Sequence, residues 1–239
     1  LRIKDIDKDK LKTIFLELEF NTLGKRMFGE EFSAGPQKIT KIEEETSSEF
    51  RTIEDTKPEY YLTNTNSKRK NLIHELNKQK SFCFDIETTS LDPRSCEILG
   101  LAFSFASNTG YYAPIPEEPE DAKTVLDTFR NVLENPNIEK IGHNLKFDYS
   151  VLLWNDLEVK GPFFDTMLAA ALVTPELRKN LDYLSQALLG YSPISITELI
   201  GEKGDEQKTL REVDLNRVAQ YAAEDADITL QLSEVLRPK

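Results

Sequence analysis

The chain has 239 residues, of which 39% are hydrophobic and 30% charged, and its 42 acidic and 30 basic residues give a net charge of −12. This composition argues against a wholly disordered chain, and the sequence has no apolar run near the roughly 20 residues that a membrane span requires. Two cysteines exclude a disulfide framework and a cysteine-rich zinc site. The acidic balance argues against binding nucleic acid through a broad basic surface. We therefore expect a soluble, cytoplasmic, globular protein.

The N-terminal quarter of the chain is predicted to contain one short helix and a linker. Apolar residues recur at helical spacing between Asp7 and Phe20, which predicts an amphipathic helix with little else to pack on. The stretch from Ser33 to Thr56 has three consecutive glutamates and few aromatic residues, a composition typical of a flexible acidic linker. The folded domain is expected to start near Tyr60.

From there on, predicted strands and helices alternate. Turn residues and alternating apolar residues predict strands at 60–63, 81–87, 100–106, 110–115 and 138–143. Helical spacing predicts helices at 67–79, 121–133, 145–154, 165–172, 181–189, 196–200 and about 214–236. Strands mixed with helices predict an α/β fold with a sheet flanked by helices.

The first of three acidic motifs is SFCFDIETTSLD at 81–92. Alternation along a strand places Phe82, Phe84 and Ile86 on one face and Asp85 and Glu87 on the other. Neighbouring carboxylates on one face repel each other and are costly to desolvate. Either a cation lies between them, or this end of the strand opens to solvent.

The second motif, GHNLKFD at 142–148, lies where a predicted strand passes into a helix. Such passages often present polar groups at the edge of a sheet. Asp148 falls in the first turn of the helix among apolar neighbours. It is either a residue that complements the helix dipole or a member of a site.

The third motif, YAAEDA at 221–226, lies on the last helix. Asp225 interrupts an apolar stripe, and no Lys or Arg lies one turn away to pair with it. It is either a buried hydrogen-bonded residue or a member of a site. Glu224 and Asp227 lie off the stripe and are expected to be ordinary solvated charges. The stripe consists of Tyr221, Asp225, Ile228, Leu232 and Val235.

Together the three motifs supply four carboxylates and a tyrosine. Oxygen ligands of this kind suit two hard divalent cations, which lie about 4 Å apart when they bind the two sides of a phosphoryl transfer. Two Mg²⁺ or Mn²⁺ ions are therefore expected. They would also neutralise the local carboxylates and allow a phosphodiester to bind.

The motifs DIETTSLD, HNLKFD and YAAEDADITLQL, in this order, resemble those of the 3′-5′ proofreading exonuclease domain of bacterial DNA polymerase I. That domain belongs to the DEDD exonucleases and has an RNase H-like fold. The resemblance implies a fragment of a larger polymerase that works at the nucleoid, with the polymerase domain in cis, and a monomer. Residues 1–32 would be the tail of a 5′-nuclease-like domain, 33–59 a flexible acidic linker and 60–239 the exonuclease domain.

The resemblance also implies roles for the acidic residues. Asp85, Glu87 and Asp225 would hold the more tightly bound metal ion. Asp85 would also bridge to the second ion, and Asp148 would reach that ion through water. The substrate would be a single-stranded or frayed DNA 3′ end.

Tyr221, assisted by Glu87, would orient the attacking hydroxide, and the product would be a nucleoside 5′-monophosphate. Gln220 stands where another subclass of the family carries a histidine. A tyrosine four residues before Asp225 therefore implies the tyrosine subclass.

Substrate contacts are implied for Thr88 at the 3′ end, for Leu91 against the terminal bases and for Asn144 on the DNA strand, although each could be an ordinary loop residue. Leu210 stands where some relatives carry a stacking aromatic residue. His143 is expected near the site without being a ligand, and Cys83 is expected to be a packing residue.

Two alternatives remain open. One is an RNA-trimming enzyme of the RNase D type, because the sequence shows no clear 2′-hydroxyl reader. The other is an inactive scaffold, which some polymerase I proteins retain. Loss of an acidic motif residue would signal a scaffold, and none is missing here.

Overall fold

The computed structural model describes residues 7–17, 20–29, 32, 50–202, 204 and 207–239. The chain forms two compact units, Leu1–Glu49 and Phe50–Lys239. Residues 33–49 of the predicted linker lie outside the described residues. The second unit begins earlier than the expected start near Tyr60, because Arg51 forms a bridge with Tyr191 and a short helix, α3 (Ile53–Thr56), follows.

The described residues of the N-terminal unit form two helices where the sequence predicted one. They are α1 (Lys8–Glu17) and α2 (Asn21–Phe28). The ring of Phe15 lies edge-on to those of Phe20, Phe28 and Phe32, with centroids 5.7, 5.9 and 6.5 Å away. The predicted helix therefore has an aromatic partner on the next helix, contrary to the expectation that it had little to pack on.

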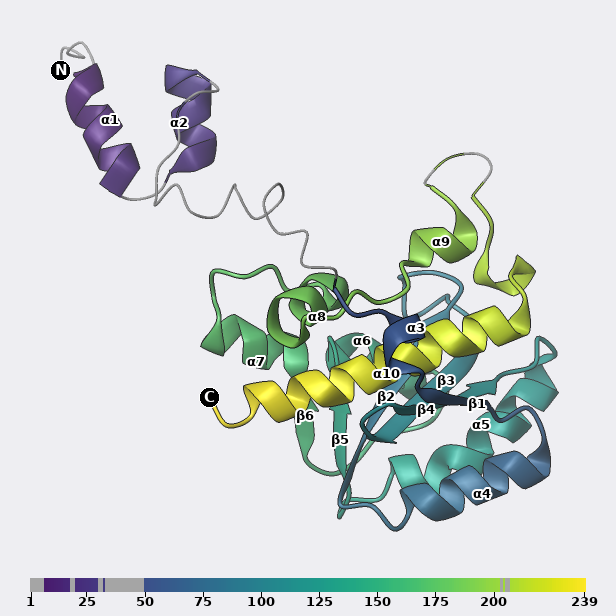
Figure 1. The fold of residues 1–239 in the computed structure, drawn as a ribbon. Coiled ribbons are helices and arrows are strands. Elements are labelled where there is room, and N and C mark those ends of the chain that lie inside the picture. Colours follow the sequence, from purple (N-terminus) through teal and green to yellow (C-terminus); the bar gives the residue numbers. More distant parts are fainter. Residues whose placement is uncertain (1–6, 18–19, 30–31, 33–49, 203, 205–206) are drawn as a thin grey trace. The chain divides into compact units, whose positions relative to one another are not determined.

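A six-stranded mixed sheet is the centre of the second unit (Figure 1). The strand order is β1-β4-β3-β2-β5-β6. Strands β2, β3 and β4 pair antiparallel, and the other pairs are parallel. Strand β6 has only three residues and was not predicted from the sequence. The strands are β1 (Glu59–Leu62), β2 (Ser81–Thr88), β3 (Ile98–Ala106), β4 (Thr109–Pro114), β5 (Glu139–Gly142) and β6 (Phe163–Asp165).

Helices cover both faces of this sheet (Figure 1). Residues of α4, α5 and α6 pack on one face, and α10 lies across the other with α7 and α8 against it. In the described part of the chain, no helix combines the length and hydrophobicity needed to cross a membrane. The helices are α4 (Asn66–Leu76), α5 (Pro119–Leu133), α6 (Leu145–Trp154), α7 (Thr166–Val173), α8 (Leu181–Leu189), α9 (Ile196–Ile200), the 3₁₀ helix η1 (Leu210–Glu212) and α10 (Leu215–Leu236).

The alternation predicted for β2 is present. Phe82, Phe84 and Ile86 pack in the core under α4, α5 and α6, whereas Cys83 packs against α10. Small residues let α10 approach the sheet closely. A Cβ atom at Gly110 of β4 would lie 2.6 Å from the carbonyl oxygen of Ala223, so only glycine fits there.

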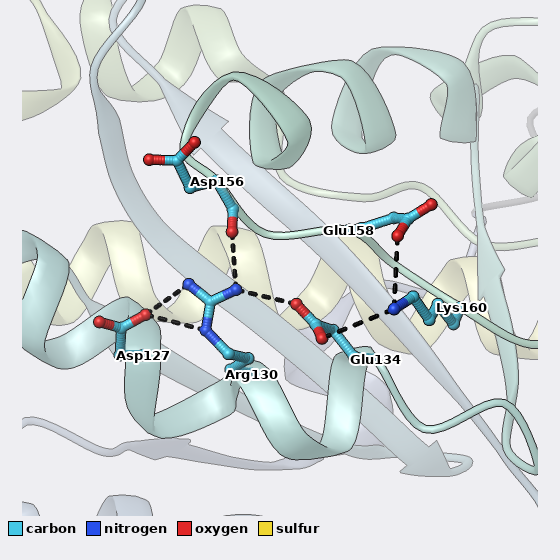
Figure 2. A network of polar contacts seen from close by, with 6 residues as sticks. All are labelled: Asp127, Arg130, Glu134, Asp156, Glu158 and Lys160. Atoms are coloured by element: carbon cyan, nitrogen blue, oxygen red, sulfur yellow. Dashed lines mark hydrogen bonds and ion pairs between the residues drawn. The ribbon is translucent and has the colours of Figure 1, made fainter.

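A network of charged residues ties the end of α5 to the loop that joins α6 to β6 (Figure 2). At its centre, the Arg130 guanidinium donates to the Asp156 carbonyl oxygen at 2.6 Å and to Glu134 at 2.8 Å. These pairs lie at the surface, where each contributes about 1 kcal/mol or less. Together they brace the connection that follows α6. The network consists of Asp127, Arg130, Glu134, Asp156, Glu158 and Lys160.

Candidate active site

Two acidic residues project from β2 toward α10. Asp85 pairs with Ala102 across the ladder to β3, and Glu87 pairs with Gly100. The register shifts between Glu87 and Thr88, so the strand leaves its regular ladder directly after the second carboxylate. Glu87 is 9% exposed. The strand therefore does not simply open to solvent at Glu87.

Helix α10 brings a third carboxylate to the pair. Asp85, Glu87 and Asp225 each offer an oxygen, and these atoms all lie within 4.8 Å of one another. Asp225 is 8% exposed, and among the described residues its Oδ1 atom has no hydrogen-bond partner. A buried carboxylate oxygen without a donor is costly unless a cation binds it. The three oxygens are the ligands that a hard divalent cation prefers, so the cluster fits a metal ion.

The pKa values of this cluster show the repulsion within it. Burial raises the pKa of Asp85 to about 6, although a hydrogen bond from the Ile86 backbone amide acts to lower it. Burial and then the charge of Asp85 raise the pKa of Glu87 to about 8. Burial, followed by the charges of Asp85 and Glu87, raises the pKa of Asp225 well above its usual range. Without a cation, the three groups therefore cannot all be ionised at neutral pH.

Asp148 lies in the first turn of α6 and is 3% exposed. It stands outside the group of three whose oxygens lie within 4.8 Å. Burial and then the charge of Asp85 raise its pKa well above the usual range, so the two carboxyls are close enough to interact. Its position suits a residue at the edge of the cluster better than one that only complements a helix dipole.

Tyr221 lies one turn before Asp225 on α10. Burial, followed by the charges of Asp225, Glu87 and Asp85, raises its pKa. A hydrogen bond from Tyr221 opposes the rise in the pKa of Asp225. The hydroxyl is therefore a neutral donor held beside the acidic cluster.

A groove of about 590 Å³ adjoins the cluster. Its lining includes Glu87, Thr88 and Leu91 from β2 and the loop after it, and Leu210 and Tyr221 from η1 and α10. Two predicted substrate residues therefore lie on the groove: Leu91, whose side chain is 89% exposed, and Thr88, whose hydroxyl donates to the Ser90 carbonyl oxygen at 2.8 Å.

Asn144 is not among the residues that line this groove. Its backbone is left-handed, with a φ of 66°, and its amide donates to Asp165 Oδ1 at 3.1 Å. Its side-chain oxygen accepts a hydrogen bond from Lys146.

His143 and Cys83 lie outside the group of three carboxylates, and only Cys83 interacts with its members. The ring nitrogens of His143 lie 2.8 Å from Thr166 Oγ1 and 2.8 Å from the Lys179 carbonyl oxygen. Burial lowers the pKa of His143 and raises that of Cys83, which is fully buried. His143 joins two segments of the chain, and Cys83 packs against α10.

The prediction that Glu224 and Asp227 are solvated charges is wrong. Their exposed fractions are 0% and 2%. Glu224 accepts hydrogen bonds from the Tyr191 hydroxyl and the Ile194 amide, and Asp227 accepts from the Tyr60 hydroxyl. The signal that could have revealed this is composition, since alanines surround both residues and a helix that is apolar on several sides is buried on several sides.

Comparison with known proteins agrees with this geometry. A family model described as 3′-5′ exonuclease matches residues 60–239. DNA polymerase I of Borreliella burgdorferi is 32% identical over 88% of this chain and 23% of its own length. DNA polymerase I of Chloroflexus aurantiacus is 35% identical over 70% of this chain and 18% of its own length. The chain thus spans about a fifth of the length of these relatives.

Solved structures share the fold. Brucella melitensis NrnC with bound Mg²⁺ superposes with a TM-score of 0.58 at 23% identity, over 75% of this chain and 80% of NrnC. Escherichia coli RNase D gives a TM-score of 0.58 at 17% identity, over 75% of this chain and 44% of RNase D. The predicted RNase H-like sheet flanked by helices is confirmed. The chain belongs to the 3′-5′ exonuclease family that includes the exonuclease domain of DNA polymerase I.

Proposed function

We propose that this exonuclease removes nucleoside 5′-monophosphates from single-stranded or frayed DNA 3′ ends with the aid of two divalent cations, Mg²⁺ or Mn²⁺. The observation that carries the proposal is the group of three carboxylate oxygens within 4.8 Å of one another, beside a groove that Tyr221 lines. A groove beside a cluster that could hold metal ions suits cleavage of a strand bound in the groove.

Asp85, Glu87 and Asp225 would hold one ion, and Asp85 with Asp148 would hold the other. Bound there, the ions would neutralise the carboxylates and stabilise the charge that develops on the phosphodiester during in-line displacement. The buried Asp225 oxygen that lacks a donor supports this assignment.

The other residues position the substrate and the attacking water. Tyr221 keeps its proton, because burial and neighbouring charges raise its pKa, so its hydroxyl can orient the water that Glu87 also contacts. Leu91, exposed at its loop, packs against the terminal bases, and Thr88 meets the 3′ end. Asn144 contacts the strand from outside the groove.

We also propose that the chain is the proofreading part of a longer DNA polymerase, because the relatives named above are polymerases of which it covers about a fifth. A polymerase domain in cis would deliver the primer end. Residues 1–32 would end a preceding nuclease-like domain. The protein would act as a monomer in the cytoplasm of a bacterium.

The test uses a 5′-labelled single-stranded DNA oligonucleotide with Mg²⁺. Stepwise shortening that stops in EDTA, and that a blocked 3′ end prevents, supports the proposal. An RNA oligonucleotide of the same sequence tests whether the enzyme prefers deoxyribose or ribose. Faster shortening of the RNA would overturn the assignment of DNA as the substrate. Internal cuts, or shortening of the blocked strand, would overturn the assignment of direction.

A further inference from the structure

Glu224 is fully buried on α10, directly before Asp225. Its carboxylate does not belong to the acidic group at the groove. One oxygen accepts a hydrogen bond from the Tyr191 hydroxyl at 2.5 Å, and the other accepts one from the Ile194 amide at 2.7 Å. Both carboxylate oxygens of Glu224 are therefore engaged by the segment that precedes α9.

That segment leads directly into a wall of the groove. Ser195 caps α9, and Ile196 and Ile200 of this helix line the groove. Helix α9 has only five residues, too few to be stable without tertiary contacts. Leu199 is its one buried residue. The position of the wall therefore depends strongly on how its first residues are held.

We propose that Glu224 is a positioning residue that holds α9 against α10 and thereby sets how tightly the groove binds the 3′ end of a nucleic-acid strand. The inference rests on the proposed function of the groove. Because Glu224 and Asp225 are adjacent on one helix, the same rigid element fixes both the wall and the proposed metal ligand. Glu224 touches neither substrate nor metal in this assignment.

This role can be tested by measuring KM and kcat separately in variants of Glu224. We expect Glu224→Ala to raise the KM for a single-stranded DNA oligonucleotide about tenfold, since two buried hydrogen bonds are lost and the Ile194 amide is left without its acceptor. The kcat at saturating DNA and the affinity for Mn²⁺ should change less than about twofold. Amide hydrogen exchange over 194–200 should become faster while exchange over β2 stays the same.

Three further variants complete the test. Glu224→Gln keeps an acceptor oxygen and should restore part of the affinity. Tyr191→Phe removes only the hydrogen bond from the Tyr191 hydroxyl and leaves the Glu224 side chain in place. It should therefore raise KM less than Glu224→Ala does. Glu234→Ala changes an exposed glutamate of the same helix and should leave KM and exchange unchanged.

Results that would overturn the proposal are a fall in kcat at constant KM, or unchanged exchange over 194–200 in both Glu224→Ala and Tyr191→Phe. If Glu224→Ala does not fold, Tyr191→Phe and Glu224→Gln carry the test. A wild-type protein that fails to shorten DNA contradicts the proposed function instead. In that case the exchange measurement still decides whether Glu224 holds α9.

Discussion

Asp85 on β2 and Asp225 on α10 are 140 residues apart in the sequence, and their carboxylate oxygens lie within 4.8 Å of each other. Removing either carboxylate removes a proposed metal ligand and also relieves repulsion. We expect Asp85→Ala or Asp225→Ala to lower hydrolysis of a DNA oligonucleotide by about 10²-fold or more. In EDTA, the melting temperature of either variant should stay level or rise.

The matched control is Asp121→Ala, which removes an exposed aspartate from the first turn of α5. It should leave hydrolysis unchanged. A variant at Asp85 or Asp225 that loses its circular dichroism spectrum, or that keeps near-normal turnover, would contradict the role given to these residues.

The stability of the metal-free protein should fall as pH rises. The pKa values of Asp85 and Glu87, about 6 and about 8, exceed their ordinary values of 3.8 and 4.5. Between the ordinary and the folded pKa values, the folded state therefore binds more protons than the unfolded state. The free energy of unfolding accordingly falls as pH rises through the folded pKa values. Urea midpoints in EDTA should be higher at pH 5.5 than at pH 8.5.

Two comparisons control this measurement. Saturating Mg²⁺ should raise the midpoint more at pH 8.5 than at pH 5.5, because the ion competes with protons for the same oxygens. Asp85→Asn should reduce the pH dependence. A midpoint that rises with pH in EDTA would show that the carboxyls are not destabilised by burial.

Strand β2 shows why part of the site could be predicted from the sequence. Alternation is a local property of an extended backbone, so the two faces of β2 follow from the order of Phe84, Asp85 and Ile86 alone. That Asp85 and Glu87 share one face could therefore be predicted without knowledge of the fold, whereas the packing of α10 on that face could not.

Helix α10 shows which contacts could not be predicted. Its sequence predicts one apolar stripe, but Tyr60 and Tyr191 cover a second side and bind Asp227 and Glu224. These partners lie 167 and 33 residues away in the sequence, so no local pattern identifies them. The close approach of Ala223 to the sheet likewise depends on a glycine in a distant strand.

Tyr221→Phe should lower kcat without changing metal affinity. The variant loses only the hydroxyl that we propose orients the attacking water, and such groups typically contribute about 10²- to 10⁴-fold to the rate. Single-turnover hydrolysis and Mn²⁺ binding measured on the same preparation check this. An equal loss of Mn²⁺ affinity would make Tyr221 a ligand or an organiser of the site.

Tyr60→Phe should destabilise the protein without affecting catalysis. It removes the hydroxyl that donates to Asp227 Oδ2 at 2.9 Å and leaves that buried oxygen without this donor. The expected cost is about 1–2 kcal/mol in the free energy of unfolding. The control is Tyr61→Phe, which removes an exposed hydroxyl that donates to Glu59 at 2.7 Å and should cost markedly less. Equal losses in the two variants would contradict this reading of Asp227.

The last prediction concerns how an acidic domain binds a polyanion. Residues 81–239 carry 14 basic and 27 acidic groups, or −13, so they offer few partners for a long phosphate track. The residues before them are different, since 64–80 carry five basic groups and one acidic group, and α4 lies among them. Binding through the groove should therefore need metal, whereas binding through α4 should not.

We expect Tyr221→Phe, which retains the carboxylates, to bind single-stranded DNA weakly in EDTA and more tightly with Mg²⁺ or Mn²⁺. The ionised members of the acidic cluster repel the terminal phosphates until cations neutralise them. The salt dependence should be shallow, equivalent to about two to four phosphate contacts if each contributes a slope near −0.7. Titrating a labelled oligonucleotide at several salt concentrations, with and without metal, measures both quantities. Tight binding in EDTA with a steep slope, lost when Lys68 and Lys70 are replaced by glutamine, would instead show that α4 dominates the contact with DNA.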